Sequence, residues 1–137
     1  MSSLPIKRSK ALMPLSREHH FDLLLAWKIR KGIRKGIGKD RIVAYILYMD
    51  EKLVRAHFED EEKWLFKPLL PKDQLCVRAM EEHTEIRKLL QQVIYEEKNT
   101  QEALLLRLAD AIEEHVRYEE RELFPHLEQV ITKAKMA

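Results

Sequence analysis

The sequence predicts an all-α protein of one domain, folded as an antiparallel four-helix bundle with up-down-up-down topology. The chain has 137 residues, the size of one ordinary domain. It holds only three glycines and five prolines, which leaves few turn residues for a fold of many short strands. Four long segments have the pattern of helices, and the short connections between them are typical of antiparallel neighbours.

The first two helices are predicted in the N-terminal half of the chain. Ser16 is a candidate N-cap for a helix from about residue 17 to residue 34, and Gly32, Gly36 and Gly38 loosen the chain around and after its end. Asp40 is the candidate N-cap of a second helix, which runs to about Phe66 and is stopped by the proline two residues later.

The other two helices are predicted in the C-terminal half. Asp73 is the candidate N-cap of a third helix that reaches about Glu97. Thr100 is the candidate N-cap of the fourth, which extends to Leu123 or beyond, with Pro125 as a kink or a stop. The predicted organisation is an N-terminal segment over residues 1–14 followed by the bundle over residues 15–133.

Composition and charge narrow the function classes. The net charge is +2, and the basic run over residues 28–41 lacks interleaved aromatic residues or a known nucleic-acid motif, so no nucleic-acid binding is expected. No stretch reaches membrane length, and no N-terminal signal is apparent. The single cysteine, Cys76, lies at helical spacing from apolar residues and is expected to be a core thiol. A cytoplasmic protein that does not bind membranes is therefore predicted.

The chain contains an internal repeat with a spacing of 58 residues. The segment that begins at His57 recurs at His115 with six identical positions, which are a histidine, two glutamates, a leucine, a phenylalanine and a second leucine. Each copy follows a helix that carries a histidine, and His83 lies in the middle of the apolar stripe of the third helix. Two similar helical hairpins packed face to face are expected to be related by an approximate twofold axis.

The repeat predicts a metal site, because histidine and glutamate four residues apart lie on one face of a helix. Imidazole nitrogen and carboxylate oxygen suit iron, manganese or zinc, and a glutamate can bridge two ions. The two hairpins together supply enough donors for two ions. The candidate metal ligands are His19, His20, His57, Glu61, His83, His115 and Glu119.

Only one histidine of the pair on the first helix is expected to be a ligand, and the two available arguments disagree. The apolar face of that helix lies nearer to His19. Alignment with the third helix favours His20, because an apolar residue follows three positions after both His20 and His83. We favour His20 slightly on this basis. His126 lies outside the matching positions of the repeat and is predicted to be a surface residue.

The sequence resembles the hemerythrin-like, HHE cation-binding domain family from Leu15 to about Leu127. The residues that carry the resemblance are Glu18, His19 and His20; His57, Glu61, Glu62, Leu65 and Phe66; Glu82 and His83; and His115, Glu119, Glu120, Leu123, Phe124 and Pro125. The resemblance implies a hemerythrin-like bundle with two iron ions joined by an oxo or hydroxo bridge. It also implies Glu61 and Glu119 as bridging carboxylates and the histidines as terminal ligands.

The chain departs from the oxygen-carrying hemerythrins at one position. Their third helix supplies two histidines one turn apart, and the second position here is Arg87. The ligand set is one histidine short unless the other member of the His19–His20 pair, Asp50, Glu62 or Tyr118 replaces it. An open position on a metal admits a small ligand.

Binding is the function that the sequence favours over catalysis. A site rich in histidine favours binding of oxygen, nitric oxide or a related small ligand, for sensing, storage or protection. The alternatives are a di-iron oxidoreductase that consumes peroxide or nitric oxide, and an iron donor in cluster repair. A third alternative is a structural metal in a bundle that binds a protein partner.

Overall fold

The computed structural model of the protein describes residues 8–96 and 100–136 and confirms the predicted four-helix bundle. Each of the four long helices of the bundle is called a rod here, because two of them consist of several helical segments in succession. The first rod is the single helix α1 (Met13–Arg34), and the third is the single helix α4 (Gln74–Tyr95). The second consists of α2 (Lys39–Met49), η1 (Asp50–Val54), α3 (Arg55–Asp60), η2 (Glu61–Phe66) and η3 (Lys67–Leu69). The fourth consists of α5 (Glu102–Tyr118), η4 (Glu119–Leu123) and α6 (Phe124–Met136).

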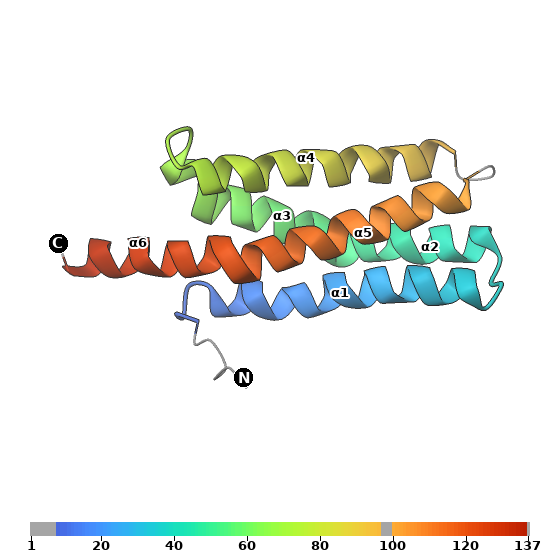
Figure 1. Ribbon diagram of the computed structural model, residues 1–137, viewed down its shortest axis with the longest axis horizontal. Coiled ribbons are helices and arrows are strands. Elements are labelled where there is room, and N and C mark those ends of the chain that lie inside the picture. The colour runs from blue at the N-terminus through green and yellow to red at the C-terminus, as the bar shows by residue number, and fades with distance from the viewer. Residues whose placement is uncertain (1–7, 97–99, 137) are drawn as a thin grey trace.

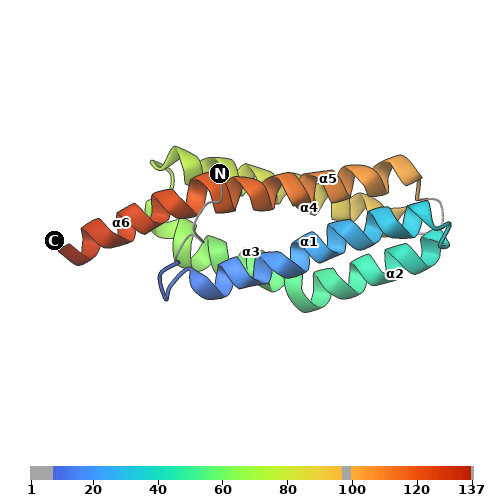
Figure 2. The same cartoon turned by 60° about the horizontal axis from the view of Figure 1, so that its bottom comes forward.

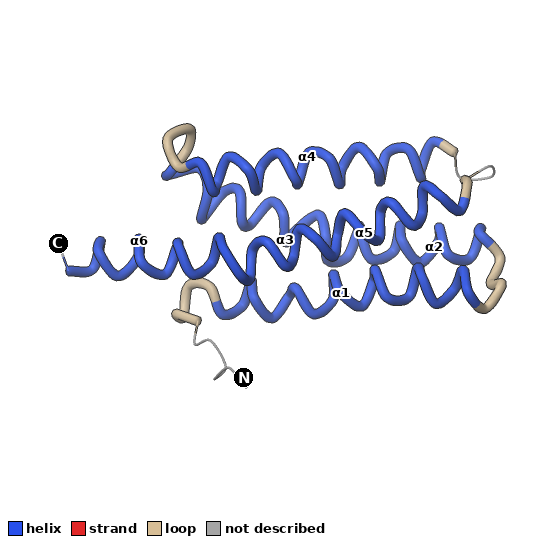
Figure 3. Tube along the Cα trace, viewed as in Figure 1, coloured by secondary structure: helices blue, strands red, loops and turns tan. Residues whose placement is uncertain are grey.

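Successive rods run in opposite directions, and the loops lie at the two ends of the bundle (Figures 1 and 3). Both views of the ribbon place α5 alongside α1, and these two helices form the most extensive helix contact (Figure 2). The C-terminal helix α6 projects beyond the other rods. None of the helices in the described residues is both long and apolar enough to cross a membrane.

Three of the four predicted N-caps are wrong. The first helix begins earlier, at Met13, and the Ser16 hydroxyl donates instead to the carboxylate of Glu120, with Oγ–Oε2 at 2.8 Å. The second begins at Lys39 without a capping side chain, so Asp40 lies in its first turn. The hydroxyl of Thr100 donates to the Glu96 carbonyl at 2.7 Å, at the end of the preceding helix. The hydroxyls of Ser16 and Thr100 therefore bond other partners than the backbone at a helix start.

The fourth capping prediction, at Asp73, is confirmed. Its Oδ1 accepts hydrogen bonds from the backbone N–H groups of Leu75 and Cys76, both at 3.1 Å. Its Oδ2 lies 2.6 Å from Nε2 of His126, which is half-buried rather than fully on the surface. The Asp73 carboxylate therefore joins the start of α4 to α6.

Replacing Asp73 by Ala should destabilise the protein by about 1–2 kcal/mol, because two helix N–H groups lose their acceptor. Urea unfolding of the two proteins measures this difference. The matched control is Asp40→Ala, at an acidic residue that makes no capping hydrogen bond, where the change should stay below about 0.5 kcal/mol. Equal losses from the two substitutions would contradict the observed difference in capping.

Gly36 ends the first helix. Its φ of 70° lies in the left-handed region, which glycine adopts without steric cost. The N–H of Gly36 bonds the carbonyl of Ile33 at 3.1 Å, and the N–H of Ile37 bonds that of Gly32 at 2.9 Å. This pair of bonds is a Schellman motif, so the predicted break has a defined turn geometry.

The internal repeat is also a repeat of backbone geometry. A π-helical segment begins at Glu61 in the second rod and at Glu119 in the fourth. In each segment a backbone N–H bonds the carbonyl five residues earlier, from Lys67 to Glu62 and from Phe124 to Glu119. Such π turns change the direction of the side chains that follow, and they are frequent at functional sites.

Pro125 does not stop the fourth helix, which continues through α6 to Met136. A proline removes one helical hydrogen bond and crowds the carbonyl four residues earlier. The π turn directly before it already departs from the α-helical bonding pattern. Of the two outcomes predicted at Pro125, a kink or a stop, the stop does not occur, because the helix widens just ahead of the proline.

Two apolar clusters fill the bundle. The larger one forms the core of the half of the bundle nearest the α1–α2 loop. Its largest fully buried side chains are Leu25, Ile29, Ile46, Ile86, Leu105 and Leu108. The smaller one lies toward the other end and consists of Leu12, Leu15, Phe66, Cys76, Ala79, Tyr118, Leu123, Phe124 and Leu127. Cys76 is fully buried, as predicted, and burial raises the pKa of its thiol to about 12.

The described part of the predicted N-terminal segment packs against the bundle. Leu12 is fully buried in the smaller cluster. The guanidinium of Arg8 donates to the backbone carbonyl of Glu120 at 2.7 Å. Residues 1–7 lie outside the described residues.

Candidate metal centre

Four histidines and two glutamates converge between the two apolar clusters. His19 comes from α1, His57 from α3, His83 from α4 and His115 from α5, while Glu61 and Glu119 begin the two π segments. On every rod the site residues lie between residues of the larger and smaller clusters. None of the six is more than 2% exposed. Apolar packing on both sides therefore encloses a polar layer.

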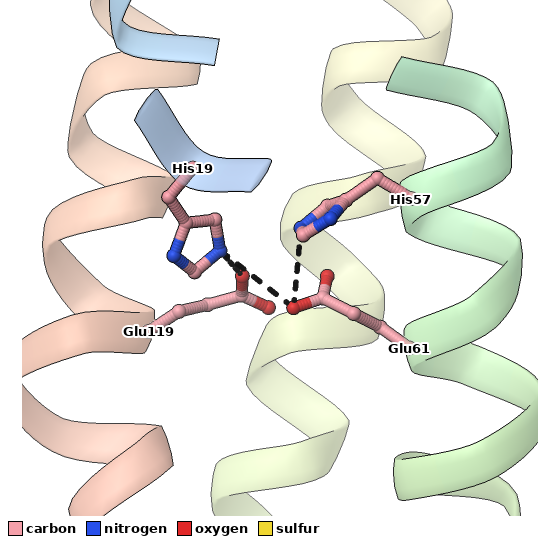
Figure 4. Close-up of side chains that lie close together, drawn as sticks. All are labelled: His19, His57, Glu61 and Glu119. Atoms are coloured by element: carbon pink, nitrogen blue, oxygen red, sulfur yellow. Dashed lines mark hydrogen bonds and ion pairs between the residues drawn. The ribbon is translucent and has the colours of Figure 1, made fainter. Parts of the chain in front are cut away.

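These six residues form two overlapping groups of potential ligands. One group is His19, His57, Glu61 and Glu119, and the other is Glu61, His83, His115 and Glu119. In each group the ligand atoms all lie within 4.8 Å of one another. Figure 4 shows the first group, with the two carboxylates meeting between the histidines. Both glutamates belong to both groups, so each has the position of a bridge.

The Nε2 atoms of all four histidines face the glutamate carboxylates. His19 Nε2 lies 2.7 Å from Glu119 Oε1, and His83 Nε2 lies 3.0 Å from Glu61 Oε1. Within the repeat, His57 Nε2 lies 3.5 Å from Glu61 Oε2, and His115 Nε2 lies 3.2 Å from Glu119 Oε2. The two halves thus present the same arrangement, as the twofold relation predicted.

Four of these buried ligand atoms have no hydrogen-bond partner among the described residues. They are Nε2 of His57, Oε2 of Glu61, Nε2 of His115 and Oε2 of Glu119. Polar atoms left unpaired in a protein interior cost free energy and are rare. A cation between imidazole nitrogens and carboxylate oxygens would satisfy them, so the residues fit a metal.

The other ring nitrogen of each histidine is held by a glutamate. The Nδ1–Oε distances are 2.7 Å for His19–Glu120, 3.3 Å for His57–Glu18, 2.6 Å for His83–Glu62 and 2.7 Å for His115–Glu82. Such carboxylate–histidine pairs orient metal-ligating imidazoles and leave Nε2 for the metal.

Charge pairing also perturbs the ionisation of the site. Burial works to lower the pKa of His19, but bonds with Glu119, Glu120 and Glu61 outweigh it and raise that pKa to about 12. His57 behaves in the same way, with its pKa raised to about 9, chiefly by Glu61 against the effect of burial. Burial opposes ionisation of Glu119, yet the histidines around it hold its pKa well below the usual value. Because metal ligation needs neutral imidazole, a bound cation would displace these protons.

The structure contradicts the preference for His20 as the inward residue. His19 is 2% exposed and belongs to the first group, whereas His20 is exposed and packs edge-on against Phe21. Neighbouring helical residues diverge by about 100°, so only one of the two can point inward. The apolar face of the helix was the better guide, and the alignment of the first and third helices was off by one residue.

A comparison with known families agrees with this geometry. The family model described as the hemerythrin HHE cation binding domain matches residues 15–127. The chain belongs to this family. No curated protein and no solved structure matches the chain significantly. The family resemblance, the bundle and the ability of the His/Glu groups to hold a cation are therefore confirmed.

In this HHE domain the residues suggested as substitutes for the missing histidine have other roles. Asp50 pairs with the exposed Arg55 at 3.2 Å, and the Tyr118 hydroxyl donates to the Leu75 carbonyl at 2.6 Å. Glu62 bonds Nδ1 of His83, and Arg87 donates to the same carboxylate at 2.7 Å. None of these residues belongs to either ligand group.

Sequence reasoning named the four glutamates that hold Nδ1 among the residues of the family resemblance but did not assign them this role, although the HHE domain carries a signal for two of them. The dipeptide Glu18–His19 recurs as Glu82–His83. Aligning these dipeptides would have matched His19 with His83 and Glu18 with Glu82. Asp22, which is buried beside the centre, was also missed.

Proposed function

We propose that the protein carries a non-haem di-iron centre in which Glu61 and Glu119 bridge two ions. The observation that carries the proposal is that the two four-residue groups share both glutamates. One ion would be held by His19 and His57, and the other by His83 and His115. Imidazole and carboxylate donors suit iron, and in the absence of thiolates nothing in this set resembles a structural zinc site.

The centre binds oxygen, nitric oxide or a related small ligand for sensing, storage or protection. With two histidines and two shared carboxylates as its ligands, each iron would keep coordination positions free for a small molecule. The bound iron would supply the redox activity and the affinity for such ligands. The protein contributes a site enclosed by apolar packing, where the fixed carboxylates orient the imidazoles.

The function is tested by optical spectra of the iron-loaded protein with and without oxygen, nitric oxide or azide. We expect a charge-transfer band that appears with the ligand and disappears when the ligand is removed. Zinc-loaded protein is the control, because zinc has no redox chemistry and should give no band. Rapid consumption of peroxide or nitric oxide without a stable adduct would contradict a binding function and favour an oxidoreductase.

A further inference from the structure

Asp22 is a buried carboxylate beside the candidate metal centre. It lies one turn after His19 on the same face of α1, and it is only 3% exposed. Its Oδ2 atom is buried and has no hydrogen-bond partner among the described residues. A carboxylate in this condition is expensive unless a charge or a hydrogen bond compensates it.

The surroundings of Asp22 link it to one half of the centre. Burial raises the pKa of its carboxyl to about 6, the charges of His57 and His19 oppose that rise, and Glu61 and Glu119 add to it. The carboxylate is absent from both groups of ligand atoms that lie within 4.8 Å of one another. Its burial one turn after His19 on α1 places it on the His19 side of the centre, outside the innermost set of ligands.

In the other half of the centre the position equivalent to Asp22 is apolar. The dipeptides Glu18–His19 and Glu82–His83 are equivalent, so the counterpart of Asp22 is Ile86, which is 1% exposed in the larger apolar cluster. On that side the ring of Phe58 stacks on His83 with centroids 3.9 Å apart. Each half thus has two histidines of its own together with both glutamates, but only the His19–His57 half has a carboxylate at the position of Asp22.

We propose that Asp22 is an additional carboxylate for the metal ion at His19 and His57, acting directly or through one water, and that it makes the two metal positions unequal in affinity. This inference rests on the proposed two-metal centre. A cation at His19 and His57 would compensate the buried Asp22 carboxylate, whose Oδ2 has no partner within residues 8–96 and 100–136. Its counterpart Ile86 offers no charge to the second ion.

Anaerobic titration of the metal-free protein with Fe²⁺, in competition with a chelator, tests the inference. Asp22→Asn should weaken the binding of one of the two ions at least tenfold and leave the other unchanged. Ile86→Leu, at the equivalent position, is the matched control and should change neither affinity. Two unchanged affinities in Asp22→Asn would overturn the inference.

Thermal unfolding separates this role from a purely structural one. Without metal, Asp22→Asn should unfold at the same or a higher temperature than the unaltered protein, because a costly buried carboxylate is gone. With iron, it should gain less stability than the unaltered protein. A lower midpoint of the variant without metal would show a structural role and overturn the inference.

The two proposals fail in different ways. If the unaltered protein binds fewer than two ions, the di-iron centre fails, and the role of Asp22 fails with it. If the unaltered protein binds two ions and the variant retains both affinities, only the role of Asp22 fails.

Discussion

Replacing Glu61 by Ala should remove at least one of two iron ions per chain and lower the free energy of unfolding by about 3–5 kcal/mol. Glu61 is fully buried and belongs to both ligand groups. Without its carboxylate, Nε2 of His83 loses its hydrogen-bond partner at 3.0 Å, and His57 loses the acidic group 3.5 Å from its Nε2. Metal analysis and denaturant unfolding of the purified variant measure the two effects. Glu119→Ala should behave alike, because Glu119 has the equivalent place in the repeat.

Neighbouring acids supply the controls for this substitution. Asp60 precedes Glu61 but is exposed, so Asp60→Ala should leave iron content and stability nearly unchanged. Glu62 holds Nδ1 of His83 rather than facing the metal, so its loss should weaken affinity by about 10–100-fold without removing an ion from a saturated protein. Loss of an ion at saturation from Glu62→Ala, equal to that from Glu61→Ala, would show that the bridging carboxylate is wrongly assigned.

His19→Ala should lower the iron content toward one ion per chain and shift the optical bands. The His19 ring contacts Glu119 through Nε2 and Glu120 through Nδ1, both at 2.7 Å. Its removal therefore takes a ligand from one ion and removes one imidazole contact from each of the two carboxylates. Iron analysis and the absorption spectrum of the variant measure the result.

The adjacent histidine is the matched control for that prediction. His20 is exposed and lies outside both ligand groups, so His20→Ala should leave the iron content and the spectrum intact. The opposite pattern, with iron lost only from His20→Ala, would mean that the first helix is rotated by about 100° from the described structure. No effect from either substitution would leave the first ion without a ligand from α1.

The fold and the repeated part of the site were predictable because they depend on local patterns. Helical periodicity and short connections predicted the four rods. The matching positions around His57 and His115 predicted the paired carboxylates, and the structure brings Glu61 and Glu119 together. It also shows that both carboxylates begin π segments, a backbone detail for which the sequence offered no signal that we recognised.

The features that were wrong or missed depend on long-range contacts. Ser16 is an ordinary N-cap residue, but its hydroxyl bonds Glu120, which is 104 residues away in the chain. Asp22 is a charged residue, a type that is rarely buried, and only the packing of α1 against its neighbours buries it. The orientation of His19 over His20 was the exception, because the apolar face of the helix already indicated it.

Iron analysis of the full chain, expressed aerobically in iron-rich medium, tests the two-metal centre most directly. The two overlapping groups of ligands predict close to two iron ions per folded chain. Far-UV circular dichroism on the same sample would establish that the helices are formed. A well-folded preparation that binds close to zero iron under these conditions would contradict the di-iron centre.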